Sequence, residues 1–564
     1  MSTTQRVAIP LLPTGVPGFD VVLGGGLPEF SFNLISGTPG AGKTTLAHQI
    51  MFANASPVRP ALYFTVMGEP PIKMLRYQQQ LSFFDLAKVG TSVRFIDLSG
   101  LLLEQDLSAV LARILEQVKA FGPGIVIVDS FQAIARAMSV GETEQPDLRS
   151  FTQRLAAYLT SWQATTFLIG EYYDRELHTN PVLTIADGVF QLSQQADRNS
   201  VVRKLQVVKS RGQAVMPGLH TFRMNQAGIQ VYPRMSIVTA EGERLRPSGR
   251  GATGVAGLDA LVGGGIPYGD AVLVSGPSGA GKSVLAAQFV AAGVAQGEPG
   301  VIAVFEEHPQ EYMRRAHSLG VDLAALERQG SVKMIYIRPL DLSPDETLTA
   351  IREAVQQIGA KRVVIDSISG FEMALAPTFR TDFRESLYRL VGSLTGTGII
   401  VLMTMEITQN TVDLRFSPYV ISFLTDDIIL LRYIEIAGQL RKSMVVVKMR
   451  NSAHNANVHM YDITDQGLII RESLQEYRSG NADAASLPTG VMLPLHPGLT
   501  DSEVIVLRAL IEQQQASVPE LLQRTGIAEQ AHVAAALDRL TSLGYAAALP
   551  GDTNLRYQPI VQRR

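Results

Sequence analysis

The segment Ser36–Thr45 reads SGTPGAGKTT, and Ser275–Val284 reads SGPSGAGKSV. Both contain the pattern GxxxxGK[ST], in which glycines let the backbone wrap phosphate groups while a Lys and a hydroxyl side chain take up charge. Short apolar runs predict a strand before each segment, and Thr45–Phe52 and Val284–Ala291 predict a helix after it. This order of strand, glycine loop and helix predicts two phosphate-binding loops.

ATP and Mg²⁺ are the cofactors that these loops predict. A hydroxyl next to the Lys and a carboxylate that closes a neighbouring strand are the usual protein groups near the metal. Thr44 with Asp129, and Ser283 with Asp366, meet that description, although an Asp can also simply end a strand. The candidate ATP-binding residues are Gly37, Thr38, Gly40, Ala41, Gly42, Lys43, Thr44 and Thr45 in the first loop and Gly276, Ser278, Gly279, Ala280, Gly281, Lys282, Ser283 and Val284 in the second.

The two loops belong to a tandem repeat. TGVPGFDVVLGGGLP at Thr14–Pro28 recurs as TGVAGLDALVGGGIP at Thr253–Pro267, and Lys209-Ser210-Arg211 recurs as Lys448-Met449-Arg450. β-rich runs alternate with helical segments in each copy, which is typical of a mainly parallel sheet with helices on both faces. We therefore expect an α/β fold with domains at residues 1–247 and 248–480.

A third unit follows the repeat. Residues 481–500 are rich in Gly, Pro, Ala and Ser and are predicted to form a linker. Helices are expected over Ser502–Gln514, Val518–Arg524 and Glu529–Leu543, and Tyr545–Ile560 suits a two-stranded wing. Residues 501–564 therefore suggest a small winged helix-turn-helix domain.

Composition excludes several classes of protein. The 564 residues carry 49 basic and 52 acidic side chains, a net charge of -3, so no global positive field favours nucleic acid or anionic lipid. There is no Cys, which excludes disulfides, thiol catalysis and Cys-ligated zinc. No apolar stretch approaches the roughly 18 residues that would span a bilayer. We expect a cytoplasmic protein without a membrane partner.

The duplicated leader and the two phosphate loops together resemble the KaiC family, whose members are built from two RecA-like ATPase domains. The resemblance covers about residues 1–480 and is most specific in the second copy, at VIDSISG and TDDIILLRYIEIAGQLRKSMVVVKMRNS. It implies two tandem RecA-like P-loop domains and a catalytic Glu pair after the strand that follows each loop helix. Glu306-Glu307 matches this pair, with a solvated acidic strand end as the alternative.

The first copy departs from the family pattern. Met67 and Gly68 stand where the Glu pair is expected, and Glu69 follows one position later. Neither Met nor Gly can orient a water for attack on a phosphate. The first site is therefore expected to bind ATP and to hydrolyse it slowly, unless Glu69 reaches in.

The resemblance also implies assembly and autophosphorylation. Lys209, Arg211, Lys448 and Arg450 match residues that reach the phosphates of a neighbouring subunit in a homo-hexamer; they could instead be solvent-facing side chains. Family members phosphorylate an adjacent Ser and Thr before the TDDIILL strand. Here Ser422 matches the first acceptor and Phe423 replaces the second, with Ser417 and Thr425 nearby. Ser422 is thus a candidate phosphoacceptor, or equally a plain structural serine.

The third unit suggests partners less directly. Residues 501–564 hold seven acidic and six basic side chains, and the predicted third helix offers only His532 and Arg539 for phosphate contacts. Arg556, Arg563 and Arg564 are the best case for DNA. Protein contact or dimerisation by this unit is therefore favoured over DNA. The family resemblance separately implies a KaiB-like or other signalling protein as a partner of the chain.

Three function classes stay open from the sequence. The first is a KaiC-like ATPase with serine autokinase activity in its second domain. The second is an ATP-gated regulatory scaffold whose winged helices bind a protein partner or DNA. The third, a recombination ATPase, would need basic DNA-binding loops, which the sequence does not show.

Overall fold

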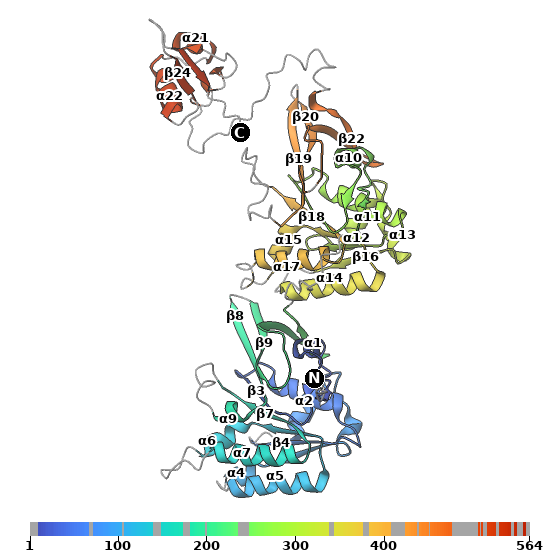
Figure 1. The fold of residues 1–564 in the computed structure, drawn as a ribbon, viewed down its shortest axis with the longest axis vertical. Helices are drawn as coiled ribbons and strands as arrows, with labels where there is room; N and C mark the ends of the chain where they lie inside the picture. Colours follow the sequence, from blue (N-terminus) through green and yellow to red (C-terminus); the bar gives the residue numbers. More distant parts are fainter. Residues whose placement is uncertain are drawn as a thin grey trace, which may run out of the picture. The chain divides into compact units, whose positions relative to one another are not determined.

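The protein folds around two nine-stranded sheets and a small three-stranded sheet (Figure 1). The computed structural model describes residues 9–66, 71–103, 107–138, 148–172, 181–197, 200–234, 247–337, 343–375, 379, 383–407, 424–436, 439–450, 452–475, 503, 506, 507, 509, 510, 516–525, 530–542, 546–549 and 556–559. The two tandem RecA-like α/β domains expected from the sequence are confirmed.

The first sheet has the strand order β11-β10-β9-β8-β3-β7-β6-β4-β5. Strands β3 to β8 pair in parallel with one another. From β8 onward the sheet is antiparallel, because β8 pairs with β9, β9 with β10, and β10 with β11. The bounds are β3 Phe32–Gly37, β4 Ala61–Thr65, β5 Val93–Asp97, β6 Ile125–Asp129, β7 Thr165–Gly170, β8 Gly188–Asp197, β9 Ser200–Ser210, β10 Leu219–Asn225 and β11 Gly228–Tyr232.

The second sheet repeats this topology strand for strand. Its order is β16-β15-β17-β18-β14-β19-β20-β21-β22, which places the loop strand β14 and the Asp366 strand β17 at the positions that β3 and β6 hold in the first sheet. The tandem duplication is therefore visible in the fold as well as in the sequence. The bounds are β14 Ala271–Gly276, β15 Gly300–Val304, β16 Val332–Tyr336, β17 Arg362–Asp366, β18 Ile400–Glu406, β19 Asp427–Ile436, β20 Gln439–Met449, β21 His459–Thr464 and β22 Gly467–Ser473.

Strand β6 shows why the central strands read as continuous apolar runs. Ile125 and Ile127 lie in the core on one face of the sheet, and Val126 and Val128 lie in the core on the other. Side chains alternate along a strand, so a strand covered on both faces must be apolar at every position. Helices α1 Phe19–Leu23, α2 Lys43–Asn54 and α3 Pro71–Gln78 supply the first core; α5 Leu107–Phe121, α6 Phe131–Met138, α7 Leu148–Ser161 and α9 Pro181–Ile185 supply the second.

By internal contacts the chain divides into two compact units. One comprises Met1–Gly254, Ile266–Ala271 and Ala286–Thr404, and the other comprises Val255–Gly265, Val272–Leu285 and Met405–Arg564. The loop helix α11 Lys282–Ala295 begins in the second unit, whereas α12 Pro309–His317, α14 Pro344–Ile358 and α17 Phe383–Thr395 lie in the first.

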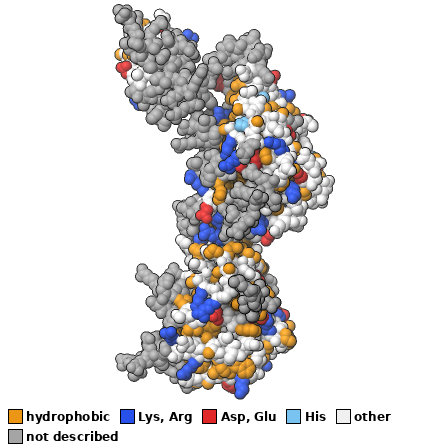
Figure 2. Space-filling view, in the orientation of Figure 1, with side chains coloured by type: hydrophobic (Ala, Val, Ile, Leu, Met, Phe, Trp, Pro, Cys, Tyr) orange, Lys and Arg blue, Asp and Glu red, His pale blue; other side chains and the backbone are white. Residues whose placement is uncertain are grey.

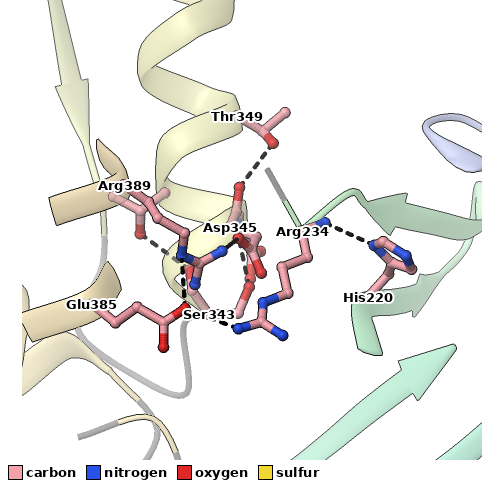
Figure 3. Close-up of polar contacts among 9 residues, drawn as sticks. His220, Arg234, Ser343, Asp345, Thr349, Glu385 and Arg389 are labelled. Carbon is pink, nitrogen blue, oxygen red and sulfur yellow. Dashed lines mark hydrogen bonds and ion pairs between the residues drawn. The ribbon is translucent and has the colours of Figure 1, made fainter. Parts of the chain in front are cut away.

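A polar cluster in the first unit joins α14 to α17 (Figure 3). Asp345 in the first turn of α14 accepts a hydrogen bond from Arg389 of α17, with 2.9 Å between Oδ1 and Nη1. Glu385 of α17 pairs with Arg234 at 2.8 Å and with Arg389 at 3.6 Å. The Ser343 hydroxyl caps α14 by accepting from the amide of Glu346.

The C-terminal part contains α21 Val518–Thr525, α22 Gln530–Ser542 and three short strands in the order β23-β25-β24, with β23 Ala516–Ser517, β24 Ala546–Leu549 and β25 Arg556–Pro559. Val533, Leu537 and Leu540 of α22 are buried together, as their spacing predicts. The second and third expected helices are thus confirmed, while the assignment as a winged helix remains a prediction.

The described surface agrees with the balanced composition. On the face in Figure 2, Lys and Arg side chains are scattered among polar, acidic and hydrophobic ones. Among the described residues, no helix has both the length and the apolar character needed to span a bilayer.

Candidate functional site

The first phosphate loop connects β3 to α2, and its glycines are required by the backbone. Gly37, Gly40 and Gly42 all have positive φ, in the range that favours Gly. A Cβ at Gly37 would lie 2.0 Å from the carbonyl oxygen of Leu192 on β8. The loop therefore has to pass so close to the neighbouring strand that any side chain at Gly37 would collide with it.

Lys43 begins α2 and folds back over this loop. Its Nζ donates to the carbonyl oxygens of Gly37 and Thr38 at 3.0 and 2.9 Å, and it lies 3.8 Å from Oε1 of Glu171. Burial lowers the pKa of Lys43, and the negative charge of Glu171 opposes that effect. A buried ammonium at the mouth of a glycine loop is the charge that a nucleotide phosphate needs.

Asp129 closes β6 beside the start of α2. Its Oδ2 accepts hydrogen bonds from the Thr44 hydroxyl at 2.8 Å and from the Tyr63 hydroxyl at 2.6 Å. Burial raises the pKa of Asp129, while these hydrogen bonds and Lys43 act in the opposite direction. A hydroxyl and a carboxylate side by side are oxygen ligands that fit Mg²⁺ when phosphates complete its shell. The structure thus brings together Lys43, Thr44 and Asp129, as predicted.

The second loop repeats this local arrangement. Nζ of Lys282 donates to the carbonyl oxygens of Gly276 and Pro277 at 2.9 and 2.8 Å, the counterparts of the Lys43 bonds. Gly279 and Gly281 again have positive φ. The Tyr461 hydroxyl of β21 donates to the carbonyl oxygen of Ala280, which ties the loop to the antiparallel part of the sheet.

The acidic residues predicted for the second site lie in the other compact unit. Glu306 and Glu307 stand two and three residues after the end of β15, and Asp366 closes β17. Ser367 donates its hydroxyl to Oε1 of Glu306 at 2.9 Å, whereas Glu307 pairs with Arg315 of α12 at 2.7 Å. Glu306 is exposed and held by a neutral group, while an arginine engages Glu307.

Asp366 has a hydroxyl partner of its own. Thr404 of β18 donates to its Oδ1 at 2.5 Å, while its Oδ2 is buried with no hydrogen-bond partner among the described residues. Tyr312 of α12 is buried near Asp366; burial first, and the negative charge of Asp366 second, raise the pKa of Tyr312 well above its usual value. Tyr312 is therefore a neutral group beside this carboxylate.

The two Lys-x-Arg pairs occupy equivalent places at the ends of β9 and β20. Lys209 donates to the carbonyl oxygen of Leu183 at 2.9 Å, and Arg211 pairs with Asp187 at 3.2 Å. In the second copy, Lys448 donates to the carbonyl oxygen of Thr425, and Arg450 pairs with Asp426 at 3.4 Å. Burial lowers the pKa of each lysine, and the neighbouring arginine adds to the effect.

Comparison with known proteins identifies the family. A family model for the KaiC ATPase matches residues 12–236 and, a second time, residues 251–475. The chain belongs to the KaiC family. The circadian clock protein KaiC3 of Synechocystis sp. is 30% identical over 483 residues, which cover 83% of this chain and 93% of the relative.

Two further KaiC relatives cover the same region. The circadian clock oscillator protein KaiC of Parathermosynechococcus lividus is 28% identical over 486 residues, covering 83% of this chain and 87% of the relative. KaiC of Synechococcus elongatus is 26% identical over 491 residues, covering 84% of this chain and 92% of the relative. The similarity therefore extends through both nucleotide sites of this KaiC-family chain.

Several predicted KaiC-type site residues lie outside the described residues. These are Met67, Gly68 and Glu69 of the first copy, the acceptor candidates Ser417 and Ser422 with Phe423, and Arg563 and Arg564. Thr425 is described, and it is fully buried.

Sequence reasoning missed three side chains at the KaiC-type sites. Tyr63 and Tyr312 lie beside the strand-end aspartates, and Glu171 lies next to Lys43. The tyrosines stand inside an apolar strand and an ordinary amphipathic helix, where no spacing marks them. Glu171 follows the apolar strand β7 directly, so its position at a strand end was a signal that could have been used.

Proposed function

We propose that this KaiC-family protein binds ATP in both repeats and hydrolyses it mainly in the second, within a homo-hexameric ring. The observation that carries the proposal is the repeated loop lysine, which in each copy bonds to two carbonyl oxygens of its own glycine loop. ATP phosphates would replace these acceptors. Lys43→Ala should impair assembly more than turnover, whereas Lys282→Ala should remove most ATPase activity. Equal losses of ATPase activity in the two variants, measured by phosphate release, would contradict the proposal that hydrolysis lies mainly in the second repeat.

In the proposed reaction, a carboxylate orients a water for in-line attack on the γ-phosphate and accepts its proton. Glu306 is the better candidate of the pair, because Ser367 orients it without neutralising it, whereas Arg315 engages Glu307. Mg²⁺, which Ser283 and Asp366 would hold with the phosphates, supplies charge stabilisation when bound.

Substituting the Glu pair tests this assignment. Glu306→Gln/Glu307→Gln should bind ATP but hydrolyse it about 10²-fold more slowly or worse, the usual scale for losing general-base assistance. Glu306→Gln alone should account for most of the loss, and Glu307→Gln for little. Wild-type turnover in the double variant would instead assign catalysis to Glu69 or another carboxylate.

We also propose autophosphorylation of Ser422 in the second repeat. Of the nearby alternatives, Thr425 is disfavoured because its side chain is fully buried. A single phosphate per chain is expected, because Phe423 cannot accept one. Mass spectrometry after prolonged incubation with Mg-ATP should find it on Ser422, and Ser422→Ala should remove it while ATPase activity persists.

The alternative function is an ATP-gated regulatory scaffold whose C-terminal unit binds a protein partner or DNA. The departure from the Glu pair at Met67-Gly68 favours it, since a site can bind ATP without turnover. Absence of phosphate on Ser422, Ser417 and Thr425, together with nucleotide-dependent assembly, would favour this scaffold over the kinase.

A further inference from the structure

We infer that Tyr63 and Tyr312 are positioning residues, whose hydroxyl groups hold the strand-end aspartates Asp129 and Asp366 in the orientation that Mg²⁺ requires at each nucleotide site. The inference rests on the proposed nucleotide binding and deepens it. It assigns a role to two residues that neither the loop motif nor the Glu pair includes.

In the first repeat, the Tyr63 side chain is held at its hydroxyl and at its ring. Its oxygen donates to Oδ2 of Asp129 at 2.6 Å, the same atom that accepts from Thr44. Its ring is fully buried, with the ring of His48 centred 4.6 Å away and that of Phe95 5.3 Å away. A side chain packed this closely cannot leave its rotamer cheaply, so Asp129 is held by a rigid donor.

In the second repeat, a tyrosine lies beside the equivalent carboxylate and comes from a different element. Tyr312 projects from α12, is 2% exposed, and lies near enough to Asp366 that burial and, second to it, the charge of that carboxylate raise its pKa. Thr404 donates a hydroxyl to Oδ1 of Asp366. The other oxygen of Asp366, Oδ2, is buried with no hydrogen-bond partner in the part of the chain that the structure describes.

The two tyrosines are not copies of one ancestral residue. Tyr63 pairs with Ile127 in its sheet, and the residue in the same register of the second sheet is Ile302, which pairs with Val364. At the spacing that relates Tyr63 to Ile302, Tyr312 of α12 corresponds to Lys73 of α3. Each repeat thus supplies the hydroxyl from a position where the other has a side chain without one.

Because each repeat places a tyrosine hydroxyl beside its strand-end aspartate from a different position, we infer that the aspartate needs this neighbour. An Asp that serves a metal has to stay in one orientation, and partners that hydrogen-bond to a ligand typically change metal affinity by about 10- to 100-fold when removed. A tyrosine that only filled the core would need no carboxylate at its hydroxyl, and Tyr→Phe would leave the metal dependence of binding unchanged.

Nucleotide binding by the full chain tests this at the first site. In a Lys282→Ala background, binding of a fluorescent ATP analogue is titrated with Mg²⁺ and also measured in EDTA. Tyr63→Phe should need roughly 10-fold more Mg²⁺ for half-maximal tightening. Binding in EDTA should not change, because the tyrosine holds the metal ligand and not the nucleotide. Tyr77→Phe, at a 61% exposed tyrosine of α3, is the matched control and should behave as its parent.

The second site is tested in the same way, with Tyr312→Phe in a Lys43→Ala background. Two results would overturn the inference: an unchanged Mg²⁺ requirement, or binding weakened equally with and without Mg²⁺, which a packing defect would produce. The proposed function itself would be contradicted if the parent variants, Lys282→Ala and Lys43→Ala with both tyrosines intact, showed no Mg-dependent nucleotide binding.

Discussion

His48 is a fully buried imidazole on the loop helix α2, next to Tyr63. Burial lowers its pKa to about 4, and Gln78 opposes the shift only in part. The unfolded chain binds a proton near pH 6.5, but the folded chain does not until about pH 4. The contribution of neutral His48 to the free energy of unfolding should therefore be fully present above pH 6.5 and should be lost as the pH drops towards 4.

The expected size of this loss can be stated. Between pH 6.5 and pH 5, His48 should cost about 2 kcal/mol of stability, at about 1.4 kcal/mol per pKa unit. Trp162, the only tryptophan, lies in the first repeat and reports its unfolding in urea. His48→Leu should remove this part of the pH dependence, whereas His317→Gln, at a side chain that is 71% exposed, should retain it. Equal slopes in both variants would contradict the assignment.

Residues of the nucleotide sites differ in how far the sequence reveals them. Lys43, Thr44 and Asp129 could be predicted, because phosphate and metal chemistry fix residue type and spacing along the chain. Tyr63 could not, because its contact with Asp129 depends on how two strands pair. A buried tyrosine in an apolar strand looks the same in sequence whether or not its hydroxyl has a functional partner.

At the scale of elements, α17 makes two ion pairs that we expect to differ in their contribution to stability, one with α14 and one with Arg234, which follows β11 (Figure 3). The side chains of Asp345 and Arg389 are 8% and 12% exposed, whereas those of Glu385 and Arg234 are 54% and 44% exposed. Asp345→Asn should destabilise the protein by about 3–5 kcal/mol, because it leaves a nearly buried guanidinium with only the exposed Glu385, 3.6 Å away, to balance its charge. Glu385→Gln should cost no more than about 1 kcal/mol.

Calorimetric unfolding of the full chain would measure both losses. Arg389→Met combined with Asp345→Asn should recover part of the stability, since removing both charges avoids leaving one buried alone. Equal destabilisation by Asp345→Asn and Glu385→Gln would show that burial does not set the value of these pairs.

The elements themselves were largely predictable. Both loop helices are found and extend beyond the predicted ranges, to Lys43–Asn54 and Lys282–Ala295. Apolar runs such as Ile125–Asp129 identified the central strands, since double burial leaves little choice of residue. Strand order was not predictable in the same way. It follows from contacts between residues far apart in the chain, and the sequence could indicate only that the two copies share one order.

At the scale of the whole molecule, the proposed ring depends on the Lys-x-Arg pairs. Within one chain, Arg211 pairs with Asp187 and Arg450 with Asp426, yet both guanidinium side chains are 58% exposed. Exposed ion pairs contribute little stability, about 0–1 kcal/mol, so Arg211 can exchange its carboxylate for a neighbour's phosphate at small cost. The exchange costs more for Arg450, because its partner Asp426 is only 11% exposed. The structure is therefore compatible with arginines that are presented to a second subunit.

ATP should then drive assembly through these cations. Light scattering of the wild type should show a hexamer at saturating Mg-ATP, and Arg211→Ala/Arg450→Ala should shift the protein towards monomer under the same conditions. Arg113→Ala is the matched control, because Arg113 is a 45% exposed arginine of α5 paired with Glu116 in its own helix, and it should assemble normally. Raising the salt concentration should weaken assembly of the wild type and of Arg113→Ala alike, since the bridging charges are screened. A hexamer that persists in the double variant would mean that other contacts close the ring, and a wild type that stays monomeric with Mg-ATP would contradict the ring itself.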